Sequence, residues 1–221
     1  MKKLALTDFT KYRYPSALEL SPDGRYLTFA LKEVDREGDG YRWNLWLYDL
    51  ESRESRQITR GDDQRQAVWE DNTHILYKTT ELDEAMRARG FEEEWTVYHR
   101  LNVCTGEECE AFRLPMSVSG LWKMDEGRYV FTGETHLDRP NLLELTGEAL
   151  EKELVRRQQT KGYKVLTELP LCENGVGMFN QTRITLFLYL EATGEYRRIT
   201  PEDYDAVSYT HLRAHETPEH L

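Results

Sequence analysis

The chain repeats one short pattern, a tight turn followed by a strand, at intervals of about fifty residues. Its clearest copy is "SPDGRYLTFAL", in which Pro22, Asp23 and Gly24 are typical turn residues and the letters after them are rich in strand formers. Asp71 lies in a corresponding turn 48 residues later, and Asp125 in a third turn after a further 54 residues. Repetition at this interval predicts a fold built from one small structural unit used several times.

A second repeated segment alternates with these turns. Leu45–Thr59 and Leu186–Thr200 align without a gap and are identical at seven of fifteen positions, and Val97–Pro115 is a looser copy. Each unit therefore reads as four short antiparallel strands joined by turns. Four-stranded units with this period are typical of the blades of a β-propeller.

The strand "NLWLYDL" is apolar on both of its alternating faces. Leu45 and Leu47 lie on one face, whereas Trp46, Tyr48 and Leu50 lie on the other. Such a strand needs cover on both sides, which stacked blades supply and the two sheets of a sandwich do not. The last strand of each unit is mostly polar, as suits an outer edge. We therefore expect an all-β fold, a partial β-propeller of about three four-stranded blades with short helical insertions.

The repeats also predict where each blade begins and ends. The expected blades are residues 16–61, 67–115 and 117–200, with a fourth starting at 201–205, so that 1–205 forms one N-terminal propeller fragment. Three blades do not close a ring, so we expect Leu186, Leu188 and Tyr189 to be partly uncovered and the chain to aggregate or dimerise.

Insertions are predicted between the second and third strands of every blade. In the third blade a helix begins after Thr146 as its N-cap, with Leu150 and Leu154 on one face. Its expected i,i+4 ion pairs are Glu148 with Lys152 and Glu153 with Arg157.

The second blade carries a shorter predicted helix, and the first carries a loop. The helix has Leu82 and Met86 on one face and Gly90 as its stop, and the loop is the charged segment 32–43. All three insertions should lie on the same rim, and loops of this kind carry function more often than scaffold strands do. We therefore expect a partner or substrate surface on that rim.

Charge and hydropathy exclude several classes of partner. The 221 residues carry a formal net charge of -11 with a pI near 5.1, which would repel phosphate backbones and anionic lipids, so no nucleic acid or membrane partner is expected. The N-terminal residues do not resemble a signal peptide, and "ITLFLYL" is too short to span a bilayer. A soluble, cytoplasmic protein is predicted, with Cys104, Cys109 and Cys172 as reduced thiols because no metal or disulfide spacing links them.

Motifs for catalysis and for cofactors are absent from the sequence. It contains no G-x-S-x-G, P-loop, G-x-G-x-x-G or H-E-x-x-H, so no catalytic residue, no metal ligand and no cofactor is predicted, and the substrate-binding residues stay unknown. Glu92–Glu94 could pair with a peptide's amino terminus or form a solvated acidic loop, of which the loop is the simpler interpretation. Single histidines at 74, 99 and 136 suit packing better than metal binding.

The segments "LELSPDGRYLTFAL", "NLWLYDLESRESRQITRGDD" and "VYHRLNVCTGEECEAFRLP" resemble the N-terminal propeller of the prolyl oligopeptidase family of serine peptidases, especially its acylaminoacyl-peptidase and dipeptidyl-peptidase branches. The resemblance extends from Met1 to about Asp205. It implies a propeller of seven or eight blades followed by an α/β-hydrolase domain with a Ser, Asp and His triad. Nothing in these 221 residues matches that second domain, so the chain itself should be inactive.

Two functions remain open at this point. The first is the non-catalytic propeller of a serine peptidase that hydrolyses peptides near their amino ends, with its hydrolase domain and peptide substrates as partners. The second is a stand-alone, TolB-like propeller that binds a protein or ligand, because such propellers also use an S-P-D-G turn before a strand.

The last residues depart from the repeat. "VSYTHLRAHET", Val207–Thr217, matches the translation of an adapter used in transposase-based sequencing libraries, and the match continues at Ala206 and at His220–Leu221. We therefore interpret 206–221 as a sequencing-adapter translation and not as native protein. This interpretation accounts for His211 and His215, whose spacing would otherwise suggest a metal pair one helical turn apart.

Overall fold

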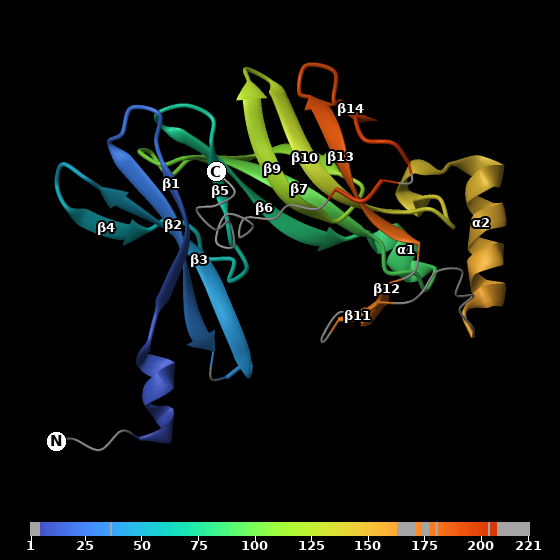
Figure 1. The fold of residues 1–221 in the computed structure, drawn as a ribbon, viewed down its shortest axis with the longest axis horizontal. Coiled ribbons are helices and arrows are strands. Elements are labelled where there is room, and N and C mark those ends of the chain that lie inside the picture. The colour runs from blue at the N-terminus through green and yellow to red at the C-terminus, as the bar shows by residue number, and fades with distance from the viewer. Residues whose placement is uncertain are drawn as a thin grey trace, which may run out of the picture.

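The protein, seen in a computed structural model, consists mainly of three four-stranded antiparallel sheets set side by side (Figure 1). The structure describes residues 5–35, 37–162, 171–173, 177–179, 181–202 and 204–206. Within each sheet the strands are neighbours in chain order, which is the meander that the repeat predicts. We call the sheets blade 1, blade 2 and blade 3.

The blades have the following strands, given from the inner to the outer edge. Blade 1 contains β1 (Tyr14–Leu20), β2 (Tyr26–Asp35), β3 (Gly40–Asp49) and β4 (Glu54–Gln57). Blade 2 contains β5 (Ala67–Trp69), β6 (His74–Leu82), β7 (Glu94–Asn102) and β8 (Glu108–Leu114). Blade 3 contains β9 (Val118–Asp125), β10 (Arg128–His136), β13 (Thr182–Leu190) and β14 (Glu195–Arg198).

The other elements precede or interrupt the blades. They are η1 (Leu6–Lys11), α1 (Glu84–Ala88), η2 (Leu142–Glu144), α2 (Gly147–Thr160) and the small hairpin of β11 (Leu171–Glu173) and β12 (Gly177–Phe179). No helix in the described part of the chain is long and apolar enough to cross a membrane.

Two apolar cores hold the three blades together. The inner strand β1 lies beside β5, and β5 lies beside β9, so the sheets fan out from their inner strands (Figure 1). Ala30, Leu45 and Leu47 of blade 1 pack on residues of blade 2 such as Ile75 and Tyr77. Blade 2 therefore covers the face of β3 that carries Leu45 and Leu47, whereas Trp46 and Tyr48 on the opposite face are only half-buried.

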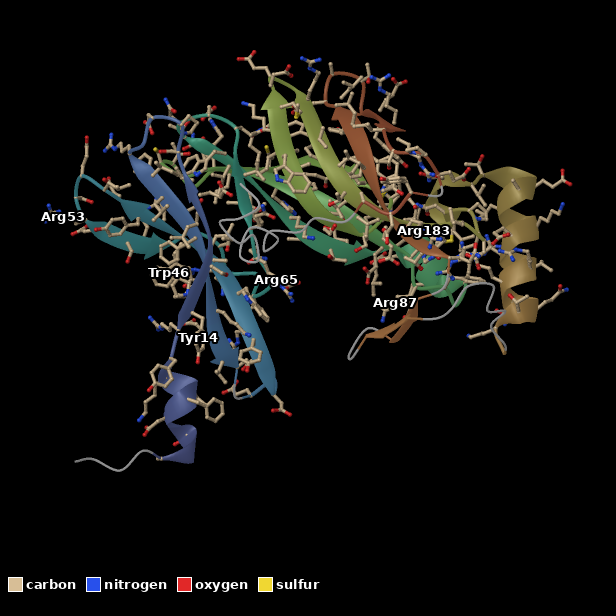
Figure 2. The ribbon with its side chains drawn as sticks, viewed as in Figure 1. Tyr14, Trp46, Arg53, Arg65, Arg87 and Arg183 are labelled. Atoms are coloured by element: carbon tan, nitrogen blue, oxygen red, sulfur yellow. The ribbon has the colours of Figure 1, made fainter. Side chains whose placement is uncertain are left out.

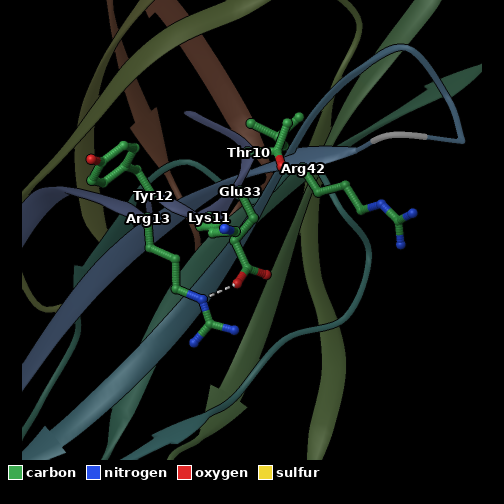
Figure 3. A pocket seen from close by; sticks show the side chains of 7 residues that line it. Thr10, Lys11, Tyr12, Arg13, Glu33 and Arg42 are labelled. Carbon is green, nitrogen blue, oxygen red and sulfur yellow. Dashed lines mark ion pairs between the residues drawn. The ribbon is translucent and has the colours of Figure 1, made fainter. Parts of the chain in front are cut away.

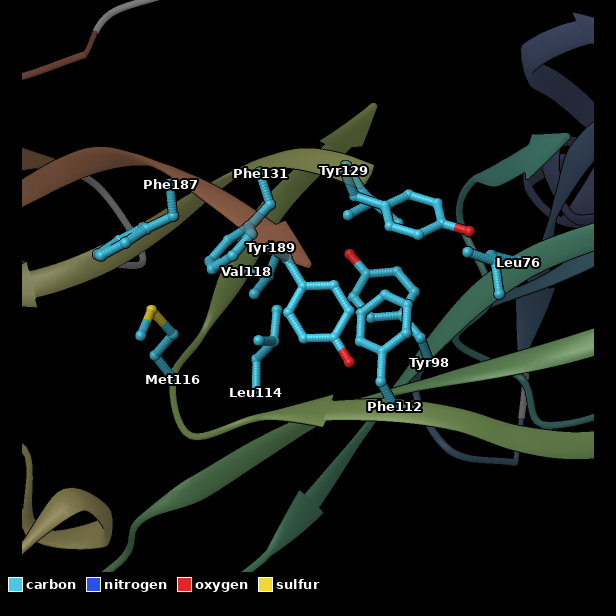
Figure 4. Packing of buried hydrophobic residues seen from close by; sticks show 11 residues of the cluster. Leu76, Tyr98, Phe112, Leu114, Met116, Val118, Tyr129, Phe131, Phe187 and Tyr189 are labelled. Carbon is cyan, nitrogen blue, oxygen red and sulfur yellow. The ribbon is translucent and has the colours of Figure 1, made fainter. Parts of the chain in front are cut away.

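The core between blades 2 and 3 is dominated by aromatic rings (Figure 4). Phe112 of blade 2 stacks on Tyr189 of blade 3 with 4.3 Å between ring centroids, and Phe131 stacks on Phe187 at 5.0 Å. Tyr189 is only 4% exposed, so the expectation that it would be uncovered is wrong. It lies on the face of β13 that meets blade 2, whereas Leu186 and Leu188, on the opposite face, are half-buried as expected.

The repeated aspartates organise the turns between the first and second strands. Asp23 accepts a hydrogen bond from the Ser21 hydroxyl at 2.6 Å and another from the amide of Arg25. Asp71 accepts from the amides of Thr73 and His74 at 2.7 and 2.8 Å. A carboxylate that binds the amides of its own turn stabilises the tight reversal, which explains the aspartate in blades 1 and 2. In blade 3 Asp125 instead accepts a hydrogen bond from the Arg128 side chain at 2.6 Å.

The turns between the third and fourth strands are also repeated. Arg53, Gly106 and Gly194 occupy the same position in the three turns, with φ of 61°, 79° and 69°. Each donates its amide to the carbonyl four residues earlier, at 2.8, 2.8 and 2.9 Å. Two blades use glycine, which tolerates positive φ, and blade 1 places an arginine there.

The predicted helices form, with one correction. Helix α2 follows Thr146 as predicted, and Glu153 pairs with Arg157 at 3.1 Å. In α1 the buried residue is Met86, but Leu82 lies in β6 and is 43% exposed, so its placement on the helix is wrong. Strand β6 continues that far because it pairs with β7 up to Leu82 and Glu94.

The charged segment of blade 1 is not a loop. Lys32–Asp35 and Gly40–Trp43 continue β2 and β3 as a regular antiparallel ladder, with Lys32 opposite Trp43. Residues 37–39 lie in the turn between the two strands. The first insertion is therefore a long hairpin.

Candidate interaction surface

The insertions of all three blades lie on one side of the sheets, which we call the insertion side. In Figure 1 the turn of the β2–β3 hairpin, α1 and α2 are on the opposite side from the short β9–β10 and β13–β14 turns. The side of the short turns is here named the turn side. Every second-to-third strand connection leaves its sheet in the same direction, since the three meanders have the same topology.

On the insertion side the helices of blades 2 and 3 share a small core of their own. Met86 of α1 packs with Leu154 of α2 and with Leu142 of η2, and all three are at most 8% exposed. Phe91 and Leu150 pack against this cluster. The two insertions therefore form one helical unit that spans two blades.

Ion pairs fasten α2 to blade 2. The guanidinium of Arg89 donates to both carboxylate oxygens of Glu151 at 2.9 and 2.6 Å. Arg157 donates to Glu93 at 2.7 Å and to Glu153 at 3.1 Å, and its side chain is only 13% exposed. Paired, directional bonds of this kind orient the helix as well as holding it.

This arrangement decides part of the question raised by Glu92–Glu94. The Glu93 carboxylate is occupied by Arg157, whereas Glu92 and Glu94 are exposed. Glu93 therefore has a structural role, and of these three glutamates only Glu92 and Glu94 present their carboxylates to the solvent.

The β2–β3 hairpin forms the other border of the insertion side. A hollow of about 390 Å³ lies between η1 and the hairpin, lined by Thr10–Arg13, Glu33, Val34 and Arg42 (Figure 3). Arg13 pairs with Glu33 at 2.6 Å, and Arg42 pairs with Asp35 at 2.6 Å. The hydrogen bond from Arg42 is the largest cause that lowers the pKa of Asp35 to about 2. The charges around the hollow thus neutralise one another within the chain.

Cations and aromatic rings alternate along the hairpin. The Lys32 ammonium lies 3.7 Å from the centroid of the Tyr41 ring and 5.2 Å from that of Trp43, and the Arg65 guanidinium lies 4.2 Å from the Trp43 ring. Arg65, labelled in Figure 2, belongs to the link that follows β4. These contacts stiffen the base of the hairpin and tie that link to blade 1.

On the turn side an ionic cluster joins blades 2 and 3. Arg100 of β7 donates to Glu70 at 2.5 and 2.7 Å and to Glu191 at 2.7 Å. The Tyr129 hydroxyl donates to Glu70 at 2.6 Å, and the Lys123 ammonium donates to the Glu70 carbonyl. Burial opposes ionisation of Glu70, but the bonds from Arg100 and Tyr129 outweigh it, and its pKa lies below the usual value. No local sequence pattern indicates this cluster, because Arg100 lies 30 residues from Glu70 and 91 residues from Glu191.

One chain of hydroxyl, imidazole and carboxylate groups occurs within blade 2. The Thr79 hydroxyl lies 3.0 Å from Nε2 of His99, and Nδ1 of His99 lies 3.4 Å from Glu108. The ring of Tyr77 stacks on His99, with 5.3 Å between centroids, and Tyr77 is buried in the core shared with blade 1. The groups join adjacent strands, so they have a packing role and do not resemble a catalytic triad with an accessible nucleophile.

The two other single histidines of the blades, His74 and His136, also have packing roles. His74 lies 2.9 Å from Asp71 in its turn, and burial lowers the pKa of His136 to about 4 beside Thr182. Among the described residues no cluster of His, Cys, Asp and Glu side chains could hold a metal ion. His211, His215 and the segment from 207 onward lie outside the described residues.

Three four-stranded meanders that fan from adjacent inner strands define a partial β-propeller, as the repeat predicts. In fold, the chain is similar to solved structures of acylaminoacyl peptidases. An acylaminoacyl peptidase from Pyrococcus horikoshii aligns with 87% of this chain at a TM-score of 0.58 and 13% sequence identity. An acylaminoacyl peptidase in complex with a chloromethyl ketone aligns with 86% of it at a TM-score of 0.57 and 12% identity.

These similarities confirm the fold that the sequence resemblance implies. The chain spans only 26% of the length of either peptidase. A putative TolB from Agrobacterium tumefaciens also aligns, with 13% identity over 85% of this chain and 48% of its own, at a TM-score of 0.41. No protein-family model matches the sequence, and no curated protein matches it significantly.

Proposed function

We propose that the chain is the non-catalytic propeller portion of a serine peptidase that hydrolyses peptides near their amino ends. The observation that carries the proposal is the similarity of its three blades to acylaminoacyl peptidase, at a TM-score of 0.58. The sequence resemblance to the prolyl oligopeptidase family supports it independently, because that resemblance rests on turn and strand motifs and not on coordinates.

In this proposal the blades select substrates and the partner domain carries out the chemistry. The insertion side supports a selecting role, because a hairpin, a helical unit and the exposed Glu92 and Glu94 stand there on a scaffold of paired strands. Carboxylates of this kind suit the amino terminus of a peptide. A cytoplasmic location remains a prediction from the sequence.

The decisive experiment is recovery of the uninterrupted gene from its genomic source. A G-x-S-x-G motif after a strand, followed in chain order by Asp and His, is the expected result. The full-length protein should then hydrolyse aminoacyl or N-acylated chromogenic amides, and a serine-directed phosphonate should block the reaction. The 221-residue chain is the matched control and should show no turnover, because its sequence has no G-x-S-x-G motif and its described residues present no nucleophile and base arranged for this chemistry.

A stand-alone binding propeller is the second candidate, and it is favoured by the S-P-D-G turn that TolB-like propellers share. Further blades followed by a stop codon in the genomic gene would establish it and refute the peptidase proposal. Turnover traced to the 221-residue chain itself would contradict both.

A further inference from the structure

The two contacts between blades differ in kind. Blades 2 and 3 are joined along their whole height by polar bonds, aromatic rings and a shared helical unit, whereas blades 1 and 2 share mainly an aliphatic core. This asymmetry concerns the mechanics of the fold and does not depend on the proposed function.

Blades 2 and 3 are linked at several levels. On the turn side Arg100 bridges Glu70 and Glu191, and in the middle Phe112 stacks on Tyr189. Toward the insertion side the Thr96 hydroxyl donates to the Met116 carbonyl at 2.8 Å and accepts from the Val118 amide at 3.2 Å, and the Lys78 ammonium donates to the Val118 carbonyl. These links tie the first strand of blade 3 to the middle strands of blade 2.

The helical unit adds a further clamp outside the sheets. Arg89 and Glu93 from the blade 2 insertion pair with Glu151 and Arg157 of α2, around the core that contains Met86. The chain between β8 and β9 is only residues 115–117. The short connection and the ion pairs of the helical unit therefore restrict the separation of blades 2 and 3.

Blades 1 and 2 are joined more sparsely. The Trp69 indole donates to the Glu19 carbonyl at 3.2 Å, the Arg56 guanidinium donates to the Val103 carbonyl, and the Cys104 thiol donates weakly to the Tyr26 hydroxyl at 3.9 Å. Within the described part of the chain no ion pair and no ring stack connects the strands of blade 1 to those of blade 2. An aliphatic contact is not directional, so it resists sliding or rotation less than a network of oriented bonds does.

The link between blades 1 and 2 also moves with blade 1. The Trp43 amide donates to the Asp62 carbonyl and the Gln64 amide donates to the Trp43 carbonyl, both at 2.9 Å, so the link is held along β3. The Arg65 side chain covers the Trp43 ring as well. Only Gln66 then remains before β5 begins at Ala67, which leaves one short hinge.

We propose that the chain opens between blades 1 and 2. Blades 2 and 3 with their helices form one rigid body, and blade 1 with its hairpin and link rotates about Gln66 as a second body. The opening exposes the core of Leu45, Leu47 and Ala67 while the aromatic core between blades 2 and 3 stays closed. Blade 1 therefore acts as a gate that opens at the inner strands, because its contact with blade 2 has few directional bonds.

Reactivity of buried thiols tests this opening. In a background with Cys104, Cys109 and Cys172 replaced by serine, Leu47→Cys places a thiol in the blade 1–2 core and Leu121→Cys places one in the blade 2–3 core. The two leucines are matched, at 3% and 2% exposure. Labelling by an aromatic disulfide reagent under native conditions measures how often each core opens.

The Leu47→Cys thiol should react at least about tenfold faster than the Leu121→Cys thiol, after correction for any difference in their free energies of unfolding in urea. Adding Arg100→Leu should speed labelling of Leu121→Cys and leave Leu47→Cys unchanged, because it weakens only the second interface. Equal corrected rates, or faster labelling at Leu121→Cys, would overturn the proposal. If either variant does not fold, Ala67→Cys and Val118→Cys, each 1% exposed in the parent chain, give the same comparison.

Discussion

Replacing Arg53 by glycine should stabilise the protein. Arg53 is the third-to-fourth strand turn residue of blade 1, with φ of 61°, where blades 2 and 3 have Gly106 and Gly194. Its side chain is exposed and points away from the sheets at the tip of the turn (Figure 2). The substitution therefore removes a strained Cβ and no buried contact.

The expected gain is the difference between two opposing terms. A residue with a Cβ in the left-handed region costs about 1–2 kcal/mol, and the extra backbone entropy of glycine in the unfolded chain costs about 0.5–1 kcal/mol. The net gain in the free energy of unfolding should be about 0.5–1 kcal/mol, which corresponds to a rise of roughly 1–4 °C in the unfolding midpoint for a chain of this size.

Thermal and urea unfolding of the parent chain, Arg53→Gly and Arg53→Ala measure the effect. Arg53→Ala is the matched control, because it removes the same charge and keeps the Cβ, and it should bring no gain. The reciprocal change, Gly106→Ala, should destabilise by about 1 kcal/mol. If Arg53→Gly is no more stable than Arg53→Ala, or if Gly106→Ala is as stable as the parent, the conformational reasoning is wrong.

Three further predictions follow from the ionic contacts and from the end of the chain. Arg100→Leu leaves the Glu70 carboxylate, 10% exposed, without its guanidinium partner and should lower the free energy of unfolding in urea by about 3 kcal/mol. Tyr129→Phe removes one hydrogen bond to the same carboxylate and should lower it by about 1 kcal/mol. Equal losses would contradict a central role for Arg100. Burial opposes ionisation of Asp71, but hydrogen bonds from the amides and side chains of its turn outweigh burial and lower its pKa to about 2. The ionised carboxylate therefore stabilises the fold above the pKa of the unfolded chain, and this stability should fall as the pH drops from about 4 to about 2. Asp71→Asn, which keeps an acceptor for the turn amides, should show a shallower loss in that window, and an unchanged slope would refute the assignment. Deleting residues 207–221 should leave the unfolding midpoint and zinc affinity unchanged, because a segment translated from an adapter has not been selected to pack on the blades. A lower midpoint or weaker zinc binding would show that the segment belongs to the fold.

The residues of the turns and strands were sufficient to predict the fold. Asp23 and Asp71 each accept a hydrogen bond from the amide two residues later. The apolar residues on both faces of β3 can be read from the alternation of its own sequence. Local hydrogen bonding and period-two patterning depend on neighbours in sequence, so a repeat of them is readable without coordinates. The helix after Thr146 is local for the same reason.

Contacts between distant segments were decided only by the tertiary structure. The sequence does not indicate that Arg100 would meet Glu191, that Glu93 would be occupied by Arg157, or which face of β13 would carry Tyr189 against blade 2. A charged or aromatic side chain has many possible partners of the same kind, and the choice among them depends on how the sheets are stacked and which way each strand faces. The sequence by itself determined the blade, because a blade is held by local turns and paired neighbours, whereas the stacking of blades decided which contacts are directional and where the chain can open.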